Sequence, residues 1–231
     1  MELWVVFDNR ATNSAFKCGW GYSVFLRPYG LLFDTGSEPA SLLHNLSLAG
    51  ISLTELNTVF LSHFHWDHAG GLLGLLSRLE KPLKVVLHRG FSPRFAAEVA
   101  RLGGEVVFLD EEGPFGEGLF TTGALEAPTP EAALILPAEG LLLTGCAHPG
   151  IRELVLLAGR LLGRPPSLVM GGFHLLNRPK KEVLSLAHEL KALGVKRLAP
   201  SHCTGEKAER VLAEVFGDDF LWVGAGSRLL V

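Results

Sequence analysis

The sequence predicts an α/β fold, and three observations support this prediction. Apolar runs of strand length alternate with amphipathic runs of helix length from residue 38 onward. Several of the strand-like runs end in short turns that contain glycine and histidine. Of the 231 residues, 48% are hydrophobic, which is enough for a sizeable core. No stretch reads as a linker, so we expect one domain over residues 1–231.

The first elements are expected to be β-strands joined by turns, at residues 3–7, 22–26 and 31–33, before Asp34-Thr35-Gly36. The pattern then changes to alternating helices and strands, which is typical of βα units. We predict a helix at 39–48, a strand at 58–61, a helix at 68–79, a strand at 85–88, a helix at 93–102 and a strand at 105–109.

A long loop is expected over residues 110–130, because this stretch is rich in glycine, proline and acidic residues; it contains one short strand at 119–121. Strands at 132–136 and 140–144 are predicted to form a hairpin. The remaining predicted elements are helices at 151–162, 180–193 and 206–216 and strands at 167–170, 197–199, 220–223 and 228–231.

Composition excludes several classes of protein. The net charge of −3 and the pI near 6.3 give no general attraction to nucleic acids or anionic membranes. Three cysteines without regular spacing do not suggest a disulfide framework, and no signal peptide or membrane span is apparent, so we expect a cytoplasmic protein. The absence of glutamine and the low methionine content suggest a thermophile-like composition. Nothing in the sequence indicates an oligomeric state.

The segment 62–71, S-H-F-H-W-D-H-A-G-G, has the spacing of a metal site. On an extended segment His63, His65 and Asp67 would point to one side, and His68 follows as the chain turns into a helix. Imidazole and carboxylate ligands suit zinc first, with iron or manganese as alternatives. Four ligands exceed what one tetrahedral ion needs from one loop, so we expect two divalent ions. The other interpretation is a polar loop whose histidines cap a helix.

Three further histidines also follow strand-like runs, and ligands gather at the carboxyl ends of strands in α/β folds. His148, in T-G-C-A-H-P-G, and His202, in S-H-C-T-G, are predicted metal ligands. The alternatives are an exposed loop histidine and a helix cap. His174, in G-G-F-H-L, is expected to bind an anionic oxygen or donate a proton, or to be a core histidine.

Residues beside these histidines suggest supporting roles. Cys146 lies two residues before His148 and would share its side of an extended segment, either as a ligand or as a buried packing residue. Cys203 is expected to face away from His202. Asp34 is a candidate to orient a ligand imidazole. Thr204 and Gly205 offer hydroxyl and N–H groups at a helix start, where an anionic substrate would bind.

The motif H-F-H-W-D-H, the D-T-G turn and the later histidines resemble the metallo-β-lactamase superfamily over nearly the full chain. The resemblance implies a four-layer αββα sandwich, with a dinuclear site along one edge of two packed sheets and metal-bound hydroxide as the nucleophile. The ligands it implies are His63, His65 and His148 for the first metal and Asp67, His68 and His202 for the second.

One position departs from this family pattern. Residues 144–146 read T-G-C where most hydrolases of the superfamily have T-G-D, so the usual bridging carboxylate is absent. The motifs G-C-A-H-P-G, G-G-F-H-L and S-H-C-T-G resemble a subfamily related to the methanogen 7,8-dihydropterin-6-methyl-aminobenzene ribofuranoside 5'-phosphate synthase. That resemblance leaves both hydrolase and synthase activity open.

We expect a metal-dependent hydrolase that acts on a phosphate ester or a related small anionic substrate, with Asp67 and His174 as catalytic residues. One alternative is a transferase resembling the pterin/ribofuranosyl phosphate synthase, in which Trp20 and Trp66 would stack on a flat ring. For Trp66, packing under the metal loop is the favoured interpretation. The other alternative is a non-catalytic metal-binding module.

Overall fold

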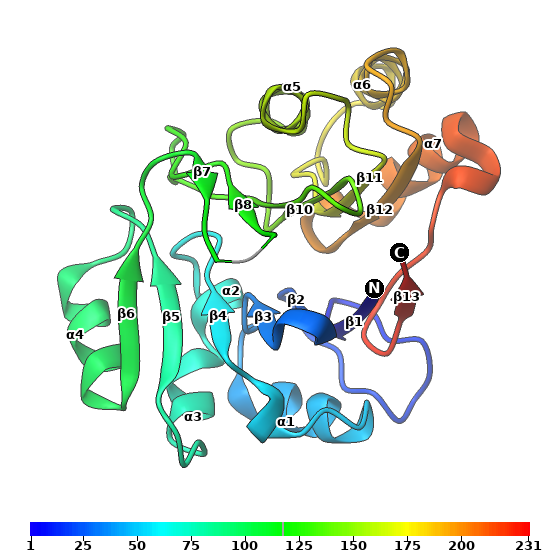
Figure 1. The fold of residues 1–231 in the computed structure, drawn as a ribbon. Helices are drawn as coiled ribbons and strands as arrows, with labels where there is room; N and C mark the ends of the chain where they lie inside the picture. Colours follow the sequence, from blue (N-terminus) through cyan, green and yellow to red (C-terminus); the bar gives the residue numbers. More distant parts are fainter. Residues whose placement is uncertain (117) are drawn as a thin grey trace. The chain divides into compact units, whose positions relative to one another are not determined.

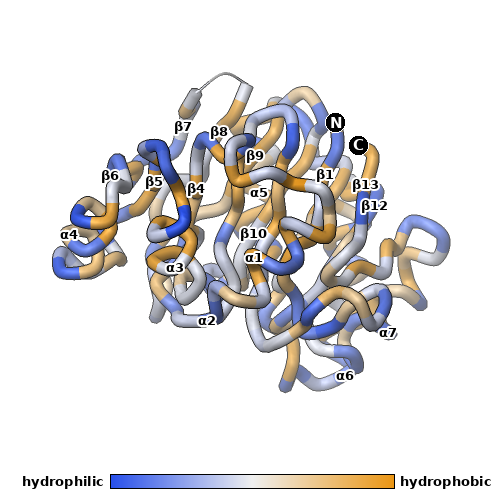
Figure 2. The backbone as a smooth tube through the Cα atoms, turned by 90° about the horizontal axis from the view of Figure 1, so that it is seen from below, coloured by the Kyte–Doolittle hydropathy of each residue, from blue (hydrophilic) through white to orange (hydrophobic). Residues whose placement is uncertain are grey.

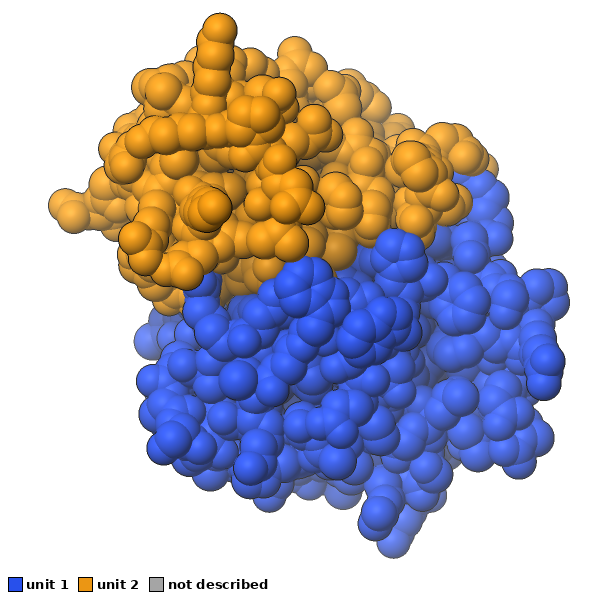
Figure 3. All heavy atoms as spheres, turned by 180° about the vertical axis from the view of Figure 1, so that it is seen from behind, with its two compact units in different colours: residues 1–110, 224–231 blue, residues 111–223 orange. Residues whose placement is uncertain are grey.

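The described part of the chain divides into two compact units. The computed structural model describes residues 1–116 and 118–231. Unit 1 consists of residues 1–110 and 224–231, and unit 2 of residues 111–223 (Figure 3). Among the described residues, each unit contains one β-sheet with helices (Figure 1). The single domain expected from the sequence stays a prediction.

Unit 1 contains a seven-stranded sheet in the order β13-β1-β2-β3-β4-β5-β6. Strands β13, β1, β2 and β3 pair antiparallel, whereas β3, β4, β5 and β6 pair parallel. This change confirms the predicted switch from hairpins to βα units. The strands are β1 (Glu2–Phe7), β2 (Ser23–Leu26), β3 (Leu31–Phe33), β4 (Thr58–Phe60), β5 (Leu83–Leu87), β6 (Gly104–Phe108) and β13 (Arg228–Leu230).

The helices of unit 1 form because apolar side chains recur on the side that meets the sheet. Alternate residues of β5, Leu83, Val85 and Leu87, share one buried cluster with side chains of α1, α3 and α4. In Figure 2, hydrophilic and hydrophobic colours alternate along α4. The helices are α1 (Pro39–Leu48), α2 (Trp66–Ala69), α3 (Leu72–Leu76) and α4 (Pro93–Arg101), with 3-10 turns η1 (Arg27–Tyr29) and η2 (Leu53–Glu55).

The single helix predicted at 68–79 is wrong, because α2 ends at Ala69 and α3 begins at Leu72. The two glycines between them approach the turn after β3 closely. A Cβ atom on Gly70 would lie 2.3 Å from the carbonyl oxygen of Ser37, and one on Gly71 would lie 2.2 Å from that of Thr35. This contact with a distant segment divides the helix and brings its first turn to the end of β3.

Unit 2 contains a six-stranded sheet in the order β12-β11-β10-β9-β8-β7. Strands β10, β11 and β12 pair parallel, and the strands from β7 to β10 pair antiparallel. The strands are β7 (Gly113–Pro114), β8 (Phe120–Thr121), β9 (Leu134–Leu136), β10 (Leu141–Thr144), β11 (Leu168–Gly172) and β12 (Arg197–Ser201). The helices and 3-10 turns are α5 (Ile151–Leu162), α6 (Lys180–Ala192), η3 (His202–Thr204), α7 (Glu206–Phe216) and η4 (Gly217–Asp219).

The core of unit 2 lies between its sheet and α5, α6 and α7. Leu142, Val169 and Leu198 occupy one side of three adjacent strands and share this cluster with apolar residues of all three helices. The three parallel strands are thereby fixed side by side, so the loops after β10, β11 and β12 leave from one edge of the sheet.

Two predictions for unit 2 need correction. The strand predicted at 220–223 is wrong: it is reduced to one bridge between Leu198 and Phe220, with the N–H of Leu221 donating to Leu198 (2.7 Å). The chain then returns to unit 1 at residue 224, where β13 pairs with β1. The loop predicted at 110–130 contains β7 as well as the expected strand; residue 117 of this loop lies outside the described residues. Within the described residues, no helix is both long and apolar enough to span a membrane.

Candidate metal centre

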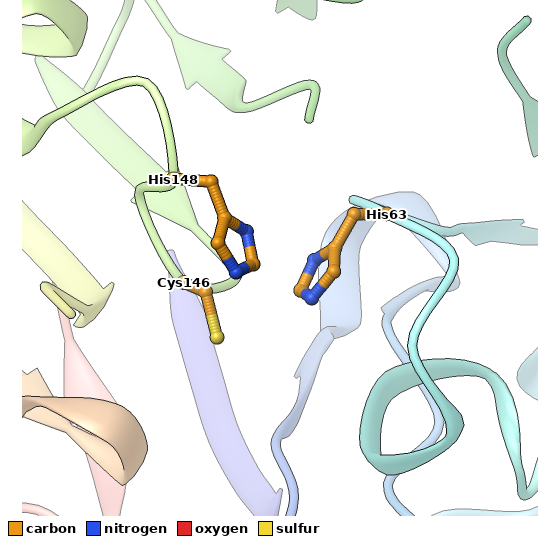
Figure 4. Close-up of side chains that lie close together, drawn as sticks. All are labelled: His63, Cys146 and His148. Carbon is orange, nitrogen blue, oxygen red and sulfur yellow. The ribbon is translucent and has the colours of Figure 1, made fainter. Parts of the chain in front are cut away.

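Unit 1 brings the four polar side chains of the 63–68 motif together just beyond β4. His63 Nε2 lies 3.1 Å from His65 Nδ1, and the rings of His63 and His68 are 4.1 Å apart. An oxygen of Asp67 lies 3.8 Å from Nε2 of His68. His63, Asp67 and His68 are buried, and Figure 4 shows His63 on the loop after β4. The structure therefore groups the motif residues as the sequence predicted, within one unit.

The expected extended conformation of residues 63–67 is wrong in part. The chain bends at His63 and Phe64 and enters α2 at Trp66, so Asp67 is already helical. The helical turn places Asp67 and His68, rather than the alternation of an extended strand. The prediction that Trp66 packs under the loop is also wrong, because this side chain is 63% exposed.

A buried hydrogen-bond network orients two of these histidines. Asp34, at the end of β3, accepts hydrogen bonds from the N–H and the hydroxyl of Ser62, each at 2.7 Å. Its second oxygen also lies 2.7 Å from Nδ1 of His68, and the hydroxyl of Ser62 lies 2.9 Å from Nδ1 of His63. His88 Nε2 lies 2.9 Å from the carbonyl oxygen of Ser62. The position of Asp34 is the one that its hypothesised orienting role requires.

Unit 2 has a comparable arrangement around Glu131, a residue that the sequence analysis missed. Oε1 of Glu131 accepts hydrogen bonds from the hydroxyl of Thr144 (3.0 Å) and the N–H groups of Gly145, Cys146 and Ala147 (3.1, 2.8 and 2.9 Å). Oε2 accepts from the N–H of His148 (2.9 Å) and lies 2.7 Å from its Nδ1. Glu131 has no exposed surface. It therefore holds the whole turn after β10 and sets the direction of the His148 ring.

The sequence did contain a weak signal for Glu131. It is an acidic residue that directly precedes the apolar run of β9 in P-T-P-E-A-A-L-I-L. A carboxylate in such a position is buried only when it has partners, because an unpaired buried charge is costly. Its partners begin 13 residues downstream, so local pattern alone did not reveal them.

Cys146 lies centrally among the other candidate ligands of unit 2. Its sulfur lies within 4.8 Å of a ring nitrogen of His148 and of a ring nitrogen of His202. The sulfurs of Cys146 and Cys203 and a ring nitrogen of His174 also lie within 4.8 Å of one another. Figure 4 shows Cys146 and His148 on the loop after β10. The extended conformation expected for this segment differs from the structure, because Ala147 has a φ of 57°. Cys203 was expected to face away from His202, but its sulfur and a ring nitrogen of His202 each lie within 4.8 Å of the sulfur of Cys146.

The backbone is strained at the ends of the strands that carry these residues. Asp34, Ala147, His174 and His202 have φ between 53° and 57°, and they are the non-glycine residues with positive φ in the described ranges. Such a conformation costs about 1–3 kcal/mol per residue and persists where the surroundings enforce it. Strained residues of this kind cluster at functional sites, which supports a functional role for the loop after β3 in unit 1 and, separately, for the loops after β10, β11 and β12 in unit 2.

Two titratable groups of unit 2 influence each other. Burial raises the pKa of the Cys203 thiol, but hydrogen bonds with Cys146 and His174, together with the charge of His202, outweigh burial and lower it. The pKa of His174 is raised, first by its hydrogen bond with Cys203, although burial opposes this. The hydrogen bond between Cys203 and His174 thus favours the anionic form of the sulfur and the cationic form of the imidazole.

The predicted substrate contacts and a nearby pocket also belong to unit 2. The hydroxyl of Thr204 accepts a hydrogen bond from the N–H of Phe173 (3.0 Å) and is buried, so it fixes the loop after β11. Gly205, with φ of 79°, directly precedes α7. A pocket of about 420 Å³ lies beside His148 and His174, and its other lining residues include Ile151, Phe173, Arg152 and Arg178 together with Glu153, Glu182 and Glu189.

Comparisons with known proteins agree on one family. Residues 29–202 match the Lactamase_B family, described as the metallo-beta-lactamase superfamily. The chain is 31% identical over 242 residues to the 7,8-dihydropterin-6-methyl-4-(beta-D-ribofuranosyl)-aminobenzene-5'-phosphate synthase of Methanocaldococcus jannaschii, with 85% of this chain and 82% of that protein covered.

Two solved structures extend the comparison. One is a metal-dependent hydrolase of the β-lactamase superfamily, 27% identical, with a TM-score of 0.86 and coverage of 100% of this chain and 99% of that chain. The other is the metallo-β-lactamase fold protein YhfI of Bacillus subtilis, 16% identical, with a TM-score of 0.72 and 99% of each chain covered. The second similarity concerns the fold alone.

Proposed function

Because the chain belongs to the metallo-β-lactamase superfamily and has its α+β fold of two sheets with helices, we propose that it is a divalent-metal-dependent hydrolase of a phosphate ester or a related small anionic substrate. Two ions are proposed, zinc first, with manganese or iron as alternatives. The proposed ligands, which follow from the family resemblance, are His63, His65 and His148 for one ion and Asp67, His68 and His202 for the other.

One observation carries the proposal: three candidate ligands have their Nδ1 atom next to an oxygen. The partners are the hydroxyl of Ser62 for His63 (2.9 Å), Asp34 for His68 (2.7 Å) and Glu131 for His148 (2.7 Å). A metal-binding histidine almost always has such a partner, which holds the proton on one nitrogen and leaves the lone pair of the other for the metal. The imidazole and carboxylate donors also suit zinc.

The remaining roles belong to residues of the chain. Divalent cations, when bound, lower the pKa of water toward 7 and polarise a phosphoryl or acyl oxygen. We assign Asp67 a second role, in which its carboxylate accepts a hydrogen bond from the attacking water and orients it. His174 is exposed and lines the same pocket as His148, with their rings 4.8 Å apart, so it is placed to protonate a leaving group or stabilise negative charge.

The pocket offers two cations to an anionic substrate, although Glu153, Glu182 and Glu189 also line it. Arg152 and Arg178 line it, although each also lies near an acidic side chain. An anionic group would therefore exchange one set of ion pairs for another. Thr204 and Gly205 remain proposed substrate contacts, through the N–H groups where α7 begins.

A second candidate function is a synthase that joins a phosphorylated sugar to a pterin-like amine. The observation that favours it is the 31% identity to the M. jannaschii synthase over most of both chains. Trp66 is 63% exposed and adjacent to Asp67, so its ring is accessible for stacking on a flat group.

A substrate panel distinguishes these functions. The protein, supplied with zinc or manganese, is offered a phosphomonoester, a phosphodiester, a thioester and a lactam. In a separate assay it is offered a phosphorylated ribose donor with a pterin-like amine. We expect turnover of a phosphate ester, reduced at least about 100-fold in Asp67→Asn and unchanged in the exposed control Asp218→Asn.

Product formation only from the ribose donor would favour the synthase. Metal binding without any turnover would contradict both activities and leave a non-catalytic metal-binding module.

A further inference from the structure

Two cysteines and a histidine of unit 2 form a cluster that the proposed hydrolase does not explain. The sulfurs of Cys146 and Cys203 and a ring nitrogen of His174 all lie within 4.8 Å of one another. They come from the loops after β10, β12 and β11, which the parallel pairing of these strands places side by side. Cys203 is 6% exposed and Cys146 is 4% exposed, whereas His174 is exposed.

The backbone around Cys203 is shaped to accommodate a sulfur atom. A Cβ atom on Gly172 would lie 2.6 Å from the sulfur of Cys203, so only glycine leaves room for it. The N–H of His174 donates a hydrogen bond to the same sulfur at 3.3 Å, with His174 held at φ of 54°. Hydrogen bonds of this kind to sulfur also surround metal-bound thiolates.

The distances suit one shared cation. Zinc binds thiolate sulfur at about 2.3 Å and imidazole nitrogen at about 2.0 Å, so tetrahedral ligand atoms are roughly 3.7 Å apart. Ligand atoms within 4.8 Å therefore need to approach by about 1 Å or less, which side-chain rotation can supply. His174 is exposed, so its imidazole is accessible to an ion from solvent, and a water molecule can occupy the fourth position.

We propose that Cys146, Cys203 and His174 form a thiolate-rich site for one soft divalent cation of the zinc and cadmium class. The inference goes beyond the proposed function, because Cys203 is not among the ligands proposed for the hydrolytic ions. Two thiolates favour soft cations over magnesium or calcium, whose preferred ligands are oxygens. His174 cannot bind this cation and donate a proton at the same time, so the two roles proposed for it exclude each other while the site is occupied.

Cadmium is the probe for this site. The full chain is freed of metal with a chelator, kept reduced, and titrated with Cd²⁺ while the ultraviolet thiolate-to-metal charge-transfer band is recorded. We expect the Cys203→Ser variant to lose about half of the wild-type band, because one of two thiolates is removed. The control is Cys18→Ser, at an exposed cysteine of unit 1, which should leave the band unchanged. A wild-type band in Cys203→Ser would overturn the proposal.

Two further measurements test the thiolate site separately from the folding of the variant and from the proposed hydrolytic ions. His63→Ala removes a proposed hydrolytic ligand, so it should lower total metal content but keep the charge-transfer band. If the hydrolase proposal fails, the thiolate site can still be present, and the reverse also holds. If Cys203→Ser unfolds, X-ray absorption of the cadmium-loaded wild type counts the sulfur atoms bound to the ion. Two bound sulfurs support the site, and one or none contradicts it.

Discussion

Replacing Glu131 by glutamine tests the connection between a buried carboxylate and the direction of the His148 ring. Glutamine has nearly the same shape, but one carboxylate oxygen becomes an NH₂ group that donates hydrogen bonds. The amide oxygen can still accept the hydrogen bonds from Thr144, Gly145, Cys146 and Ala147. The NH₂ group then faces the N–H of His148, where Oε2 accepts a hydrogen bond at 2.9 Å in the wild type.

The magnitude follows from the two contacts that change. A hydrogen bond to a charged group contributes about 1.5–3 kcal/mol, and an unsatisfied buried N–H costs about 1–3 kcal/mol. His148 can recover one contact by moving its ring proton from Nδ1 to Nε2. We therefore expect Glu131→Gln to lower the free energy of unfolding by about 2–4 kcal/mol. The proton then occupies Nε2 of His148, which is the proposed metal-binding nitrogen. Metal affinity should therefore fall about 10- to 100-fold.

Urea unfolding and competition with a chromogenic chelator measure the two effects. The matched control is Glu182→Gln, at an exposed position on α6, which should change the free energy of unfolding by less than about 0.5 kcal/mol. If Glu131→Gln matches the control in stability and binds metal as the wild type does, Glu131 does not orient His148.

Three other outcomes are expected. Asp34→Asn should lower the free energy of unfolding by about 1.5–3 kcal/mol, because His68 and Ser62 lose their charged partner. Asparagine tolerates the φ of 55°, so the backbone adds no further cost. Wild-type stability in urea would contradict this. Gly172→Ala should lower the free energy of unfolding by about 1–3 kcal/mol or more, since its methyl would lie 2.4 Å from a backbone oxygen. Gly159→Ala in α5 should instead stabilise by about 0.5–1 kcal/mol, because its methyl would make only an ordinary contact, at 3.9 Å, with a backbone oxygen. A chelator should lower the melting temperature of the metal-loaded wild type, because an ion bound to the native state stabilises it, and an unchanged melting temperature would speak against a bound ion.

Local sequence signals were sufficient for much of the fold. The predicted bounds of α1, α5 and α7 match the structure, because proline opens α1 and glycines flank both ends of α5 and α7. The break between α2 and α3 was not predictable in this way. It depends on the approach of Gly70 and Gly71 to a turn more than thirty residues earlier in the chain.

The same distinction applies to the candidate site. The histidines of the 63–68 motif could be found because they are adjacent in sequence, and their grouping within unit 1 needs few long-range contacts. Glu131 and Cys203 were missed or misplaced for physical reasons. The partners of Glu131 lie 13 to 17 residues away, and the left-handed backbone at His202 changes the direction that alternation predicts for Cys203.

Metal content measured on protein purified without added metal is the decisive test of the proposed two-ion site. We expect about two ions per chain in the wild type, and a lower content in both Asp67→Ala and His148→Ala, one variant from each unit. A metal-free wild type, or unchanged content in His148→Ala, would contradict it.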